Sequence, residues 1–262
     1  MNIRNQTNGT PIARQRDQKA PRHVPTGWLN ERVMSHFSTP IADARGLFGS
    51  YFLAPDDVGR LLSVAPEKLV VGDPVTLDVV PYSRAILEAG RARGDLLVFR
   101  AATDGNGPLT LLRMLERFPE SVQPQLLKGV GYQLKDEWTV AQEPFASTAT
   151  CRPGWRLVHG SPVASTCNLN YEQQDVALAR YAESLGLRNR LSRRSAIEVA
   201  YDTILLKRAH GTRLLEHAWD WSDTATQDGG FVTVGEFKAD GLRLVGYSRA
   251  VRFGNLGVCA QQ

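Results

Sequence analysis

Between residues 28 and 128, apolar residues occur in two patterns, short continuous runs and helical spacing. These patterns predict short strands interleaved with helices. Runs of apolar, β-branched residues predict strands at 69–71, 75–80 and 96–101. Apolar residues at helical spacing predict helices at 56–62, 84–92 and 109–118. Asp56 and Ser83 are the expected N-caps of the first two helices, and Pro119 ends the third. This order favours a mixed α/β region.

The second half of the chain carries two longer helical patterns followed by strand signals. Apolar spacing predicts helices over 171–185 and 195–209. The pairs Asp228-Gly229 and Asp240-Gly241 each precede runs of β-branched and aromatic residues, which is typical of short strands joined by tight turns. The region 129–158 is rich in aromatic and turn residues and predicts a packed core under irregular backbone. The chain therefore ends in a small sheet.

These patterns together predict an α+β protein. Its expected parts are an arm at 1–27, a mixed α/β region at 28–128 and a third region at 129–262. The arm is rich in polar residues, has almost nothing apolar to bury, and carries the basic residues Arg14, Arg16, Lys19 and Arg22. It is interpreted either as a docking arm for an acidic partner or, more simply, as a solvated leader.

Composition changes this picture little. The net charge of +4 is modest, because 31 Lys and Arg nearly balance 27 Asp and Glu, so a protein that coats nucleic acid is not indicated. No stretch approaches the roughly 18 apolar residues of a membrane span, and the first residues lack a secretory signal, so we expect a cytoplasmic protein. Cys151, Cys167 and Cys259 are then expected as thiols, with a Cys151–Cys167 disulfide as the alternative in an oxidising compartment.

Motifs for catalysis, metals and cofactors are missing from the sequence. It contains no zinc spacing, no phosphate-binding glycine loop and no nucleophile elbow, so we expect no catalytic residue, no cofactor and no metal site. Two weaker patterns remain open. Asp220, Asp223 and Asp228 offer oxygens to Ca²⁺ but equally fit solvated turns, and Asp136 or Glu143 beside aromatic residues fits a general acid.

The C-terminal region resembles C-type-lectin-like domains in the order of three motifs. They are Trp219-Asp220-Trp221-Ser222, the run Asp228–Gly235, and Gly257-Val258-Cys259. More narrowly, residues 129–262 look like the formylglycine-generating-enzyme-like branch used by variable proteins of diversity-generating retroelements. The resemblance implies two helices before a small antiparallel sheet, a ligand-binding face on the terminal strands and loops, and no catalysis.

Departures from that family narrow the expectation. The Trp-Asn-Asp triplet of calcium-dependent sugar-binding lectins is absent, and Glu143-Pro144-Phe145 keeps only two residues of their Glu-Pro-Asn triplet. The paired active-site cysteines of formylglycine-generating enzymes are not recognisable either. Neither calcium-mediated sugar binding nor oxidase activity is therefore expected.

The leading hypothesis is a non-enzymatic recognition protein that binds a protein or other macromolecular ligand through its terminal strands. The expected contact residues are Tyr247, Ser248, Arg249, Val251, Arg252, Phe253 and Asn255. Arginine, tyrosine and small polar residues together are typical of adaptable contact surfaces. Two alternatives stay open. One is an enzyme with Glu143 or Asp136 in a pocket between 129–158 and the terminal sheet, and the other is an assembly protein that docks through its basic arm. The sequence leaves the oligomeric state undetermined.

Overall fold

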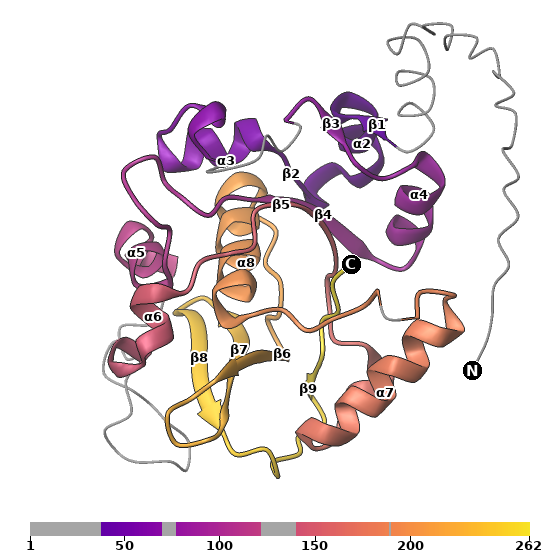
Figure 1. Ribbon diagram of the computed structural model, residues 1–262, viewed down its shortest axis with the longest axis vertical. Coiled ribbons are helices and arrows are strands. Elements are labelled where there is room, and N and C mark those ends of the chain that lie inside the picture. The colour runs from indigo at the N-terminus through magenta and orange to yellow at the C-terminus, as the bar shows by residue number, and fades with distance from the viewer. Residues whose placement is uncertain (1–37, 70–76, 122–139, 189) are drawn as a thin grey trace, which may run out of the picture.

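Strand β4, Asp95–Arg100, forms the centre of a three-stranded sheet in the computed structural model, which describes residues 38–69, 77–121, 140–188 and 190–262 (Figure 1). Strand β2, Phe52–Leu53, pairs parallel with one edge of β4, and strand β5, Gly154–His159, pairs antiparallel with the other. All six residues of β4 are buried. Because both faces of β4 are covered, its four central residues, 96–99, form a continuous apolar run instead of an alternation. The strand predicted at 96–101 is confirmed with a shift of one residue.

Four helices surround this sheet in the first half of the described chain. They are α2 at Ile41–Phe48, α3 at Pro55–Leu62, α4 at Arg84–Ala92 and α5 at Leu111–Arg117. Ser83 caps α4 as predicted, because its side chain accepts a hydrogen bond from the backbone N–H of Ile86. Asp56 as the N-cap of α3 was wrong, since the N-cap is Ala54 and Pro55 occupies the first helical position. Proline fits there because its missing N–H has no partner in the first turn.

The strands predicted at 69–71 and 75–80 are only partly testable. Leu69 follows a 3₁₀ turn at Pro66–Lys68, and Val79–Val80 forms the short strand β3, which pairs with β1 at Thr39–Pro40. Leu77 and Asp78, also predicted as strand, form a bend, and the rest of both predicted strands lies outside the described residues. The basic arm and Asp136 lie outside them as well.

The helices expected over 171–185 and 195–209 and the strands of the terminal sheet are confirmed. The stretch 129–158, predicted to be irregular, instead contains a helix at Pro144–Thr148 and most of strand β5. Helices α6, α7 and α8 span Pro144–Thr148, Tyr171–Ser184 and Ala196–His210. Strands β6, β7, β8 and β9 span Trp219–Ala225, Phe231–Lys238, Gly241–Tyr247 and Leu256–Gly257. Their order in the sheet is β8-β7-β6-β9, and β9 lies parallel to β6 while the other pairs are antiparallel. The protein is therefore an α+β protein.

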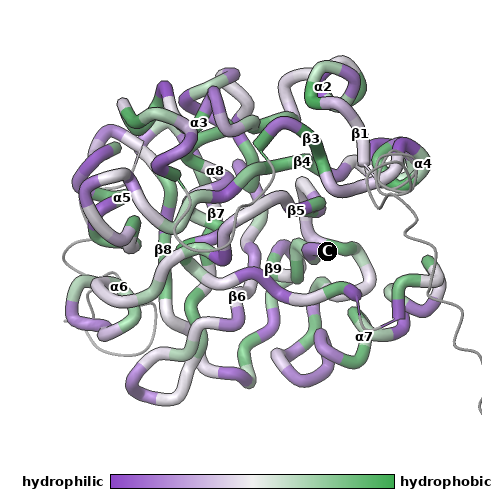
Figure 2. The backbone as a smooth tube through the Cα atoms, turned by 45° about the horizontal axis from the view of Figure 1, so that its top comes forward, coloured by the Kyte–Doolittle hydropathy of each residue, from purple (hydrophilic) through white to green (hydrophobic). Residues whose placement is uncertain are grey.

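Helix α8 connects the two halves of the fold. Figure 1 places it between the β2–β4–β5 sheet and the terminal sheet, and it contacts β2, β4, β6 and β7. Residues 196–206 of α8 are all buried, so the helix has no solvent face over that length. Figure 2 shows hydrophobic residues along β4 close to this helix. One hydrophobic cluster includes Phe99 of β4, Trp155 of β5, Leu205 of α8 and Val234 of β7.

The boundary expected between residues 128 and 129 falls in the segment that the structure leaves undescribed. On either side of that segment, β4 and β5 pair over their full length, from Asp95 with His159 to Arg100 with Gly154. Residues before and after the expected boundary therefore share one sheet and one hydrophobic cluster.

Buried charges reinforce the junction around α8. Arg100 at the end of β4 donates hydrogen bonds to Asp202 of α8, and Arg194 lies between Asp202 and Asp220 of β6. These four side chains are at most 1% exposed. Because an unpaired charge at such a depth is very costly, each member depends on its neighbours. The chain of ion pairs thus fixes α8 to both sheets.

Candidate functional site

The surface predicted for ligand contact lies at the end of β8 and in the loop 248–255 that follows it. Ser248, Arg249, Arg252 and Asn255 are exposed there, and Val251 and Phe253 are half-buried. Tyr247 differs from the expectation of an exposed contact residue, because it is only 8% exposed. Its ring packs edge-on against Phe253 with 5.5 Å between ring centroids. Tyr247 therefore supports the loop from below, and the other predicted residues form its surface.

Backbone hydrogen bonds hold the loop 248–255 at several points. The N–H groups of Tyr171 and Asn168 donate to the carbonyls of Arg249 and Phe253 at 3.1 and 3.0 Å. At the end of the loop, the N–H of Trp219 donates to the carbonyl of Asn255 at 2.8 Å. The loop is thus attached to the start of α7 and to β6, and its exposed side chains project from a supported backbone.

A stack of rings and guanidiniums lies beneath the loop. The rings of Tyr171 and Phe231 stack with centroids 4.0 Å apart. The guanidinium of Arg193 lies 4.0 Å from the Tyr171 centroid, and that of Arg249 lies 4.7 Å from the Phe231 centroid. Since each ring turns one face to the other ring, the two guanidiniums cover the outer faces. This arrangement adds cation–π attraction to the packing and orients Arg249.

Tyr171 is the centre of that stack and is anchored on all sides. Its hydroxyl donates to the carbonyl of Ser222 at 3.3 Å, and Trp221 meets its ring edge-on at 5.3 Å. Burial raises the pKa of Tyr171 to about 12, so the phenol stays neutral. The sequence analysis missed the roles of Tyr171, Phe231 and Arg193. The available signal was the position of Tyr171 as the first residue of α7, directly after the N-cap Asn170.

Charge at this surface is only partly neutralised. Arg249 forms an ion pair with Glu172 at 3.6 Å, and both side chains are more than half exposed. Arg252 is exposed and takes part in no ion pair with the residues that the structure describes. The exposed face therefore presents one loosely paired and one unpaired guanidinium, which are suited to carboxylate or phosphate oxygens of a ligand.

A groove of about 680 Å³ continues this surface along α7. Its lining includes Leu169, Gln173, Val176 and Ala177. Leu169 lies one residue after Asn168, whose backbone is bonded to the loop 248–255, so groove and loop are neighbours. Val176 is 53% exposed, which is a large value for a hydrophobic side chain. The groove adds apolar area next to the two arginines.

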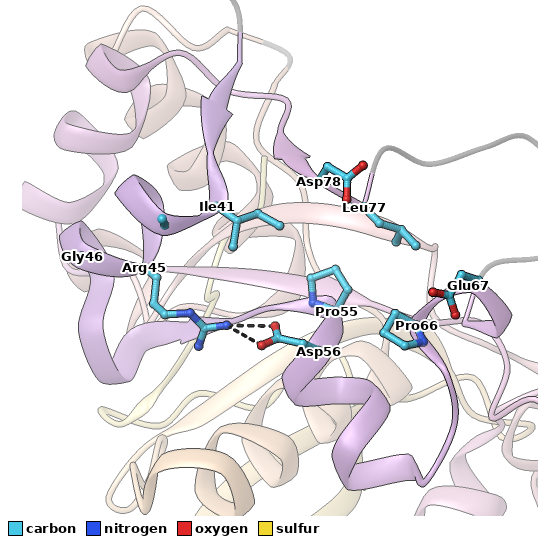
Figure 3. Close-up of a pocket in the computed structure, with 10 residues that line it drawn as sticks. Ile41, Arg45, Gly46, Pro55, Asp56, Pro66, Glu67, Leu77 and Asp78 are labelled. Carbon is cyan, nitrogen blue, oxygen red and sulfur yellow. Dashed lines mark hydrogen bonds and ion pairs between the residues drawn. The ribbon is translucent and has the colours of Figure 1, made fainter.

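A second hollow, of about 700 Å³, lies between α2 and α3 (Figure 3). Ile41, Pro55, Pro66 and Leu77 supply its apolar lining. Arg45 and Asp56 are joined by hydrogen bonds of 2.9 and 3.0 Å, and Glu67 and Asp78 lie on the opposite side of the view from Arg45. Because its one guanidinium is engaged by a carboxylate, this hollow offers neither an unpaired cation nor a reactive group.

The buried carboxylate of Glu143, one candidate for a general acid, has a backbone hydrogen-bond partner. Glu143 is buried at the start of α6, and its carboxylate accepts a hydrogen bond of 3.0 Å from the backbone N–H of Gln227. Neither hollow described above takes a lining residue from 140–158. The enzyme hypothesis stays a prediction, because residues 122–139, Asp136 among them, lie outside the described residues.

The three aspartates considered for Ca²⁺ are engaged separately. Asp220 is fully buried against Arg194, at 2.7 Å. Asp228 accepts a hydrogen bond from the Thr226 hydroxyl at 2.5 Å, which fits a side-chain-stabilised turn. Asp223 is exposed. The trio does not converge on one point, and no group of three or more metal-ligating side chains is found among the described residues.

The structure tests the expectations for the cysteines and for membrane-spanning helices. Cys151, Cys167 and Cys259 are all free thiols, so the Cys151–Cys167 disulfide is not formed in this structure. Among the described helices, none has the length and apolar character needed to cross a membrane.

Comparison of the chain with protein-family models, with curated proteins and with solved structures finds no match.

Proposed function

We propose that this protein is a non-enzymatic recognition protein that binds a protein or other macromolecular ligand through the loop 248–255 and the adjoining groove of α7. The observation that carries the proposal is that the exposed Arg249 is held in place by the ring and the backbone beneath it. Arg249 lies over Phe231 at 4.7 Å, and its carbonyl is bonded to the N–H of Tyr171. Arginine and aromatic anchors commonly supply most of the affinity of an interface.

The contacts that hold Arg249 in place affect the affinity for a ligand. A side chain that is already oriented loses less conformational freedom when a ligand binds, so more of its interaction energy appears as affinity. Arg252 and the half-buried Phe253 extend the surface, and Leu169 and Val176 add apolar contacts in the groove. The surface thus combines charge, a ring and an apolar groove within one neighbourhood.

The same proposal includes a C-type-lectin-like fold for the C-terminal region. The order of elements supports it, because α7 and α8 precede the antiparallel strands β6, β7 and β8. The loop 248–255 follows the last of these strands, where the resemblance implies the ligand-binding face.

Selection from a displayed random-peptide library tests this function. The full chain is the target, and each selected peptide is then measured against the double variant Arg249→Glu, Arg252→Glu. The matched control is Arg188→Glu, Arg190→Glu, which reverses the same number of charges at exposed positions near the end of α7. We expect the first variant to weaken binding at least about tenfold with an unchanged melting temperature, and the control to bind like the wild type. Equal binding by both variants would reject the proposed surface.

A further inference from the structure

A small hollow at the far end of α8 gathers positive charge from three separate elements. Its volume is about 200 Å³. Lys207 and Arg208 come from the last turn of α8, Arg213 from the segment after it, and Lys238 from the end of β7. Glu120 is the single carboxylate in its lining. The lining therefore carries four cations against one anion.

Ion pairs within the protein neutralise only part of this positive charge. Glu120 is taken by Arg208, at 2.7 Å. Arg213 and Lys238 reach carboxylates only at 3.6 Å, on Glu216 and Glu236 respectively. Lys207 forms no ion pair within the described ranges. Three of the four cations are thus unpaired or loosely paired.

Arg213 lies partly beneath the surface of the hollow. Its Nε is buried and has no hydrogen-bond partner among the described residues. The guanidinium lies 5.6 Å from the centroid of the Phe237 ring, so its charge is also attracted to the ring. The side chain as a whole is 27% exposed, so Arg213 reaches the surface of the hollow that it lines.

The helix dipole explains only part of the cluster. Basic residues are favoured in the last turn of a helix, which accounts for Lys207 and Arg208. It does not account for Arg213 and Lys238, which belong to other elements and meet the helix end at the same hollow. Their convergence is the feature that needs a further explanation.

We propose that this hollow binds the phosphoryl group of a small phosphorylated ligand or of free phosphate. Four cations in the lining face one lining carboxylate, and Glu216 and Glu236 outside the lining offset only part of the excess, so a phosphate dianion is attracted more strongly than a single carboxylate. Arginine supplies paired donors in one plane and lysine a mobile point charge, which is the usual combination around phosphate oxygens. Sites for whole drug-sized ligands measure about 300–1,000 Å³, so this smaller hollow suits one charged group. The loop 248–255 lies outside its lining, so the site is separate from the proposed recognition surface.

Titration of the full chain tests the site, with inorganic phosphate in one arm and glycerol 3-phosphate in the other. Calorimetry at constant ionic strength gives the affinity of each. The test variant is Lys207→Gln, Lys238→Gln, and the matched control is Arg188→Gln, Arg190→Gln. We expect saturable one-to-one binding in at least one arm, weakened about tenfold or more in the test variant and within about twofold of wild type in the control. Binding in the phosphate arm alone identifies free phosphate as the ligand, and binding of glycerol 3-phosphate identifies a phosphomonoester.

Three results would overturn this inference. The first is the absence of saturable binding in both arms. The second is equal weakening in the test and control variants, which would indicate general attraction of anions to a basic protein. The third is full affinity in the test variant when its fold is intact. Arg213→Gln serves as a second probe, since it removes the buried Nε donor itself, and its circular dichroism spectrum shows whether the variant folds.

Discussion

The guanidinium of Arg100 donates two hydrogen bonds to the carboxylate of Asp202, from Nε at 2.8 Å and from Nη2 at 2.5 Å, across 102 positions of sequence. Both side chains are fully buried. This pair links β4 to α8 and continues through Arg194 to the terminal sheet. Through this series of ion pairs, the buried charges hold the terminal sheet, and the proposed recognition surface follows the strands of that sheet.

Breaking this pair from one side should destabilise the whole fold. Asp202→Asn removes the carboxylate that Arg100 and Arg194 share and leaves Arg100 only the carboxylate of Glu198, at 3.2 Å. We expect a loss of about 3–5 kcal/mol in the free energy of unfolding. Urea denaturation measures this value. As a control, Arg188→Ala removes an exposed ion pair at 3.3 Å and should change stability by less than about 0.5 kcal/mol. A mild effect of Asp202→Asn would show that the buried network contributes little.

Gly235 should tolerate no side chain. A Cβ at this position would lie 2.7 Å from the Cα of Trp219 on the neighbouring strand, so the backbone would have to move. We expect Gly235→Ala to cost at least about 1–3 kcal/mol in urea denaturation. Gly254 has nothing within 4 Å of the same position, and Gly254→Ala should leave stability nearly unchanged. Equal stability of the two variants would contradict the packing of β6 on β7.

His159 should make stability depend on pH below neutrality. Burial lowers its pKa from the ordinary 6.5, while Asp95, 3.2 Å from Nδ1, opposes that shift and Arg93 adds to it. The Tyr181 hydroxyl is bonded to Nε2 at 2.8 Å. A lowered pKa means that the unfolded chain takes up the proton first as pH falls below 6.5. Stability is therefore complete above pH 6.5 and decreases as the pH falls toward the folded-state pKa, by at most about 1.4 kcal/mol per pH unit from this group.

Urea titrations between about pH 5 and 7.5 measure that slope against His159→Gln, which cannot titrate in this range. The difference in stability between wild type and variant should shrink as the pH falls if His159 behaves as described. A difference that grows on acidification would mean that the His159 pKa is raised in the folded state.

The three thiols should differ in reactivity. Burial raises the pKa of Cys151 and Cys259 well above the ordinary value, which keeps the reactive thiolate scarce at neutral pH. Cys167 is half-buried and its pKa is raised less. We expect Cys167 to react first with a disulfide reagent in the native protein, and all three thiols to react after denaturation. Rapid labelling of Cys151 in the native state would disagree with its burial.

Local signals made part of the helices and strands predictable, whereas α2, α6 and β5 were not predicted. Ser83 and Ser195 precede apolar residues at helical spacing, and each one caps its helix in the structure. The Asp-Gly pairs marked the turns of the terminal sheet because only local backbone conformation is needed there. The N-cap of α3 was misplaced from Ala54 to Asp56, since both acidic residues after Pro55 fit a first helical turn.

These local signals could not predict contacts between residues that are far apart in the sequence. The burial of Tyr247 depends on its position over Phe253 and within the cluster that contains Tyr171, which is 76 positions earlier by subtraction of their numbers. Arg100 ends a strand in the sequence and gives no sign that Asp202 will neutralise it. The hollow beside Lys207 forms only when α8 meets the end of β7. Such sites depend on tertiary structure, and alternation of residue types does not record them.

Hydrogen–deuterium exchange with and without a selected peptide ligand tests the recognition surface most directly. The account predicts slower exchange for the amides of 249–255 and for those at the start of α7, because the ligand would lie over Arg249 and Arg252. Amides in the second hollow, around Ile41 and Leu77, should exchange at unchanged rates. Protection confined to that hollow, with none in 249–255, would contradict recognition through the C-terminal loop.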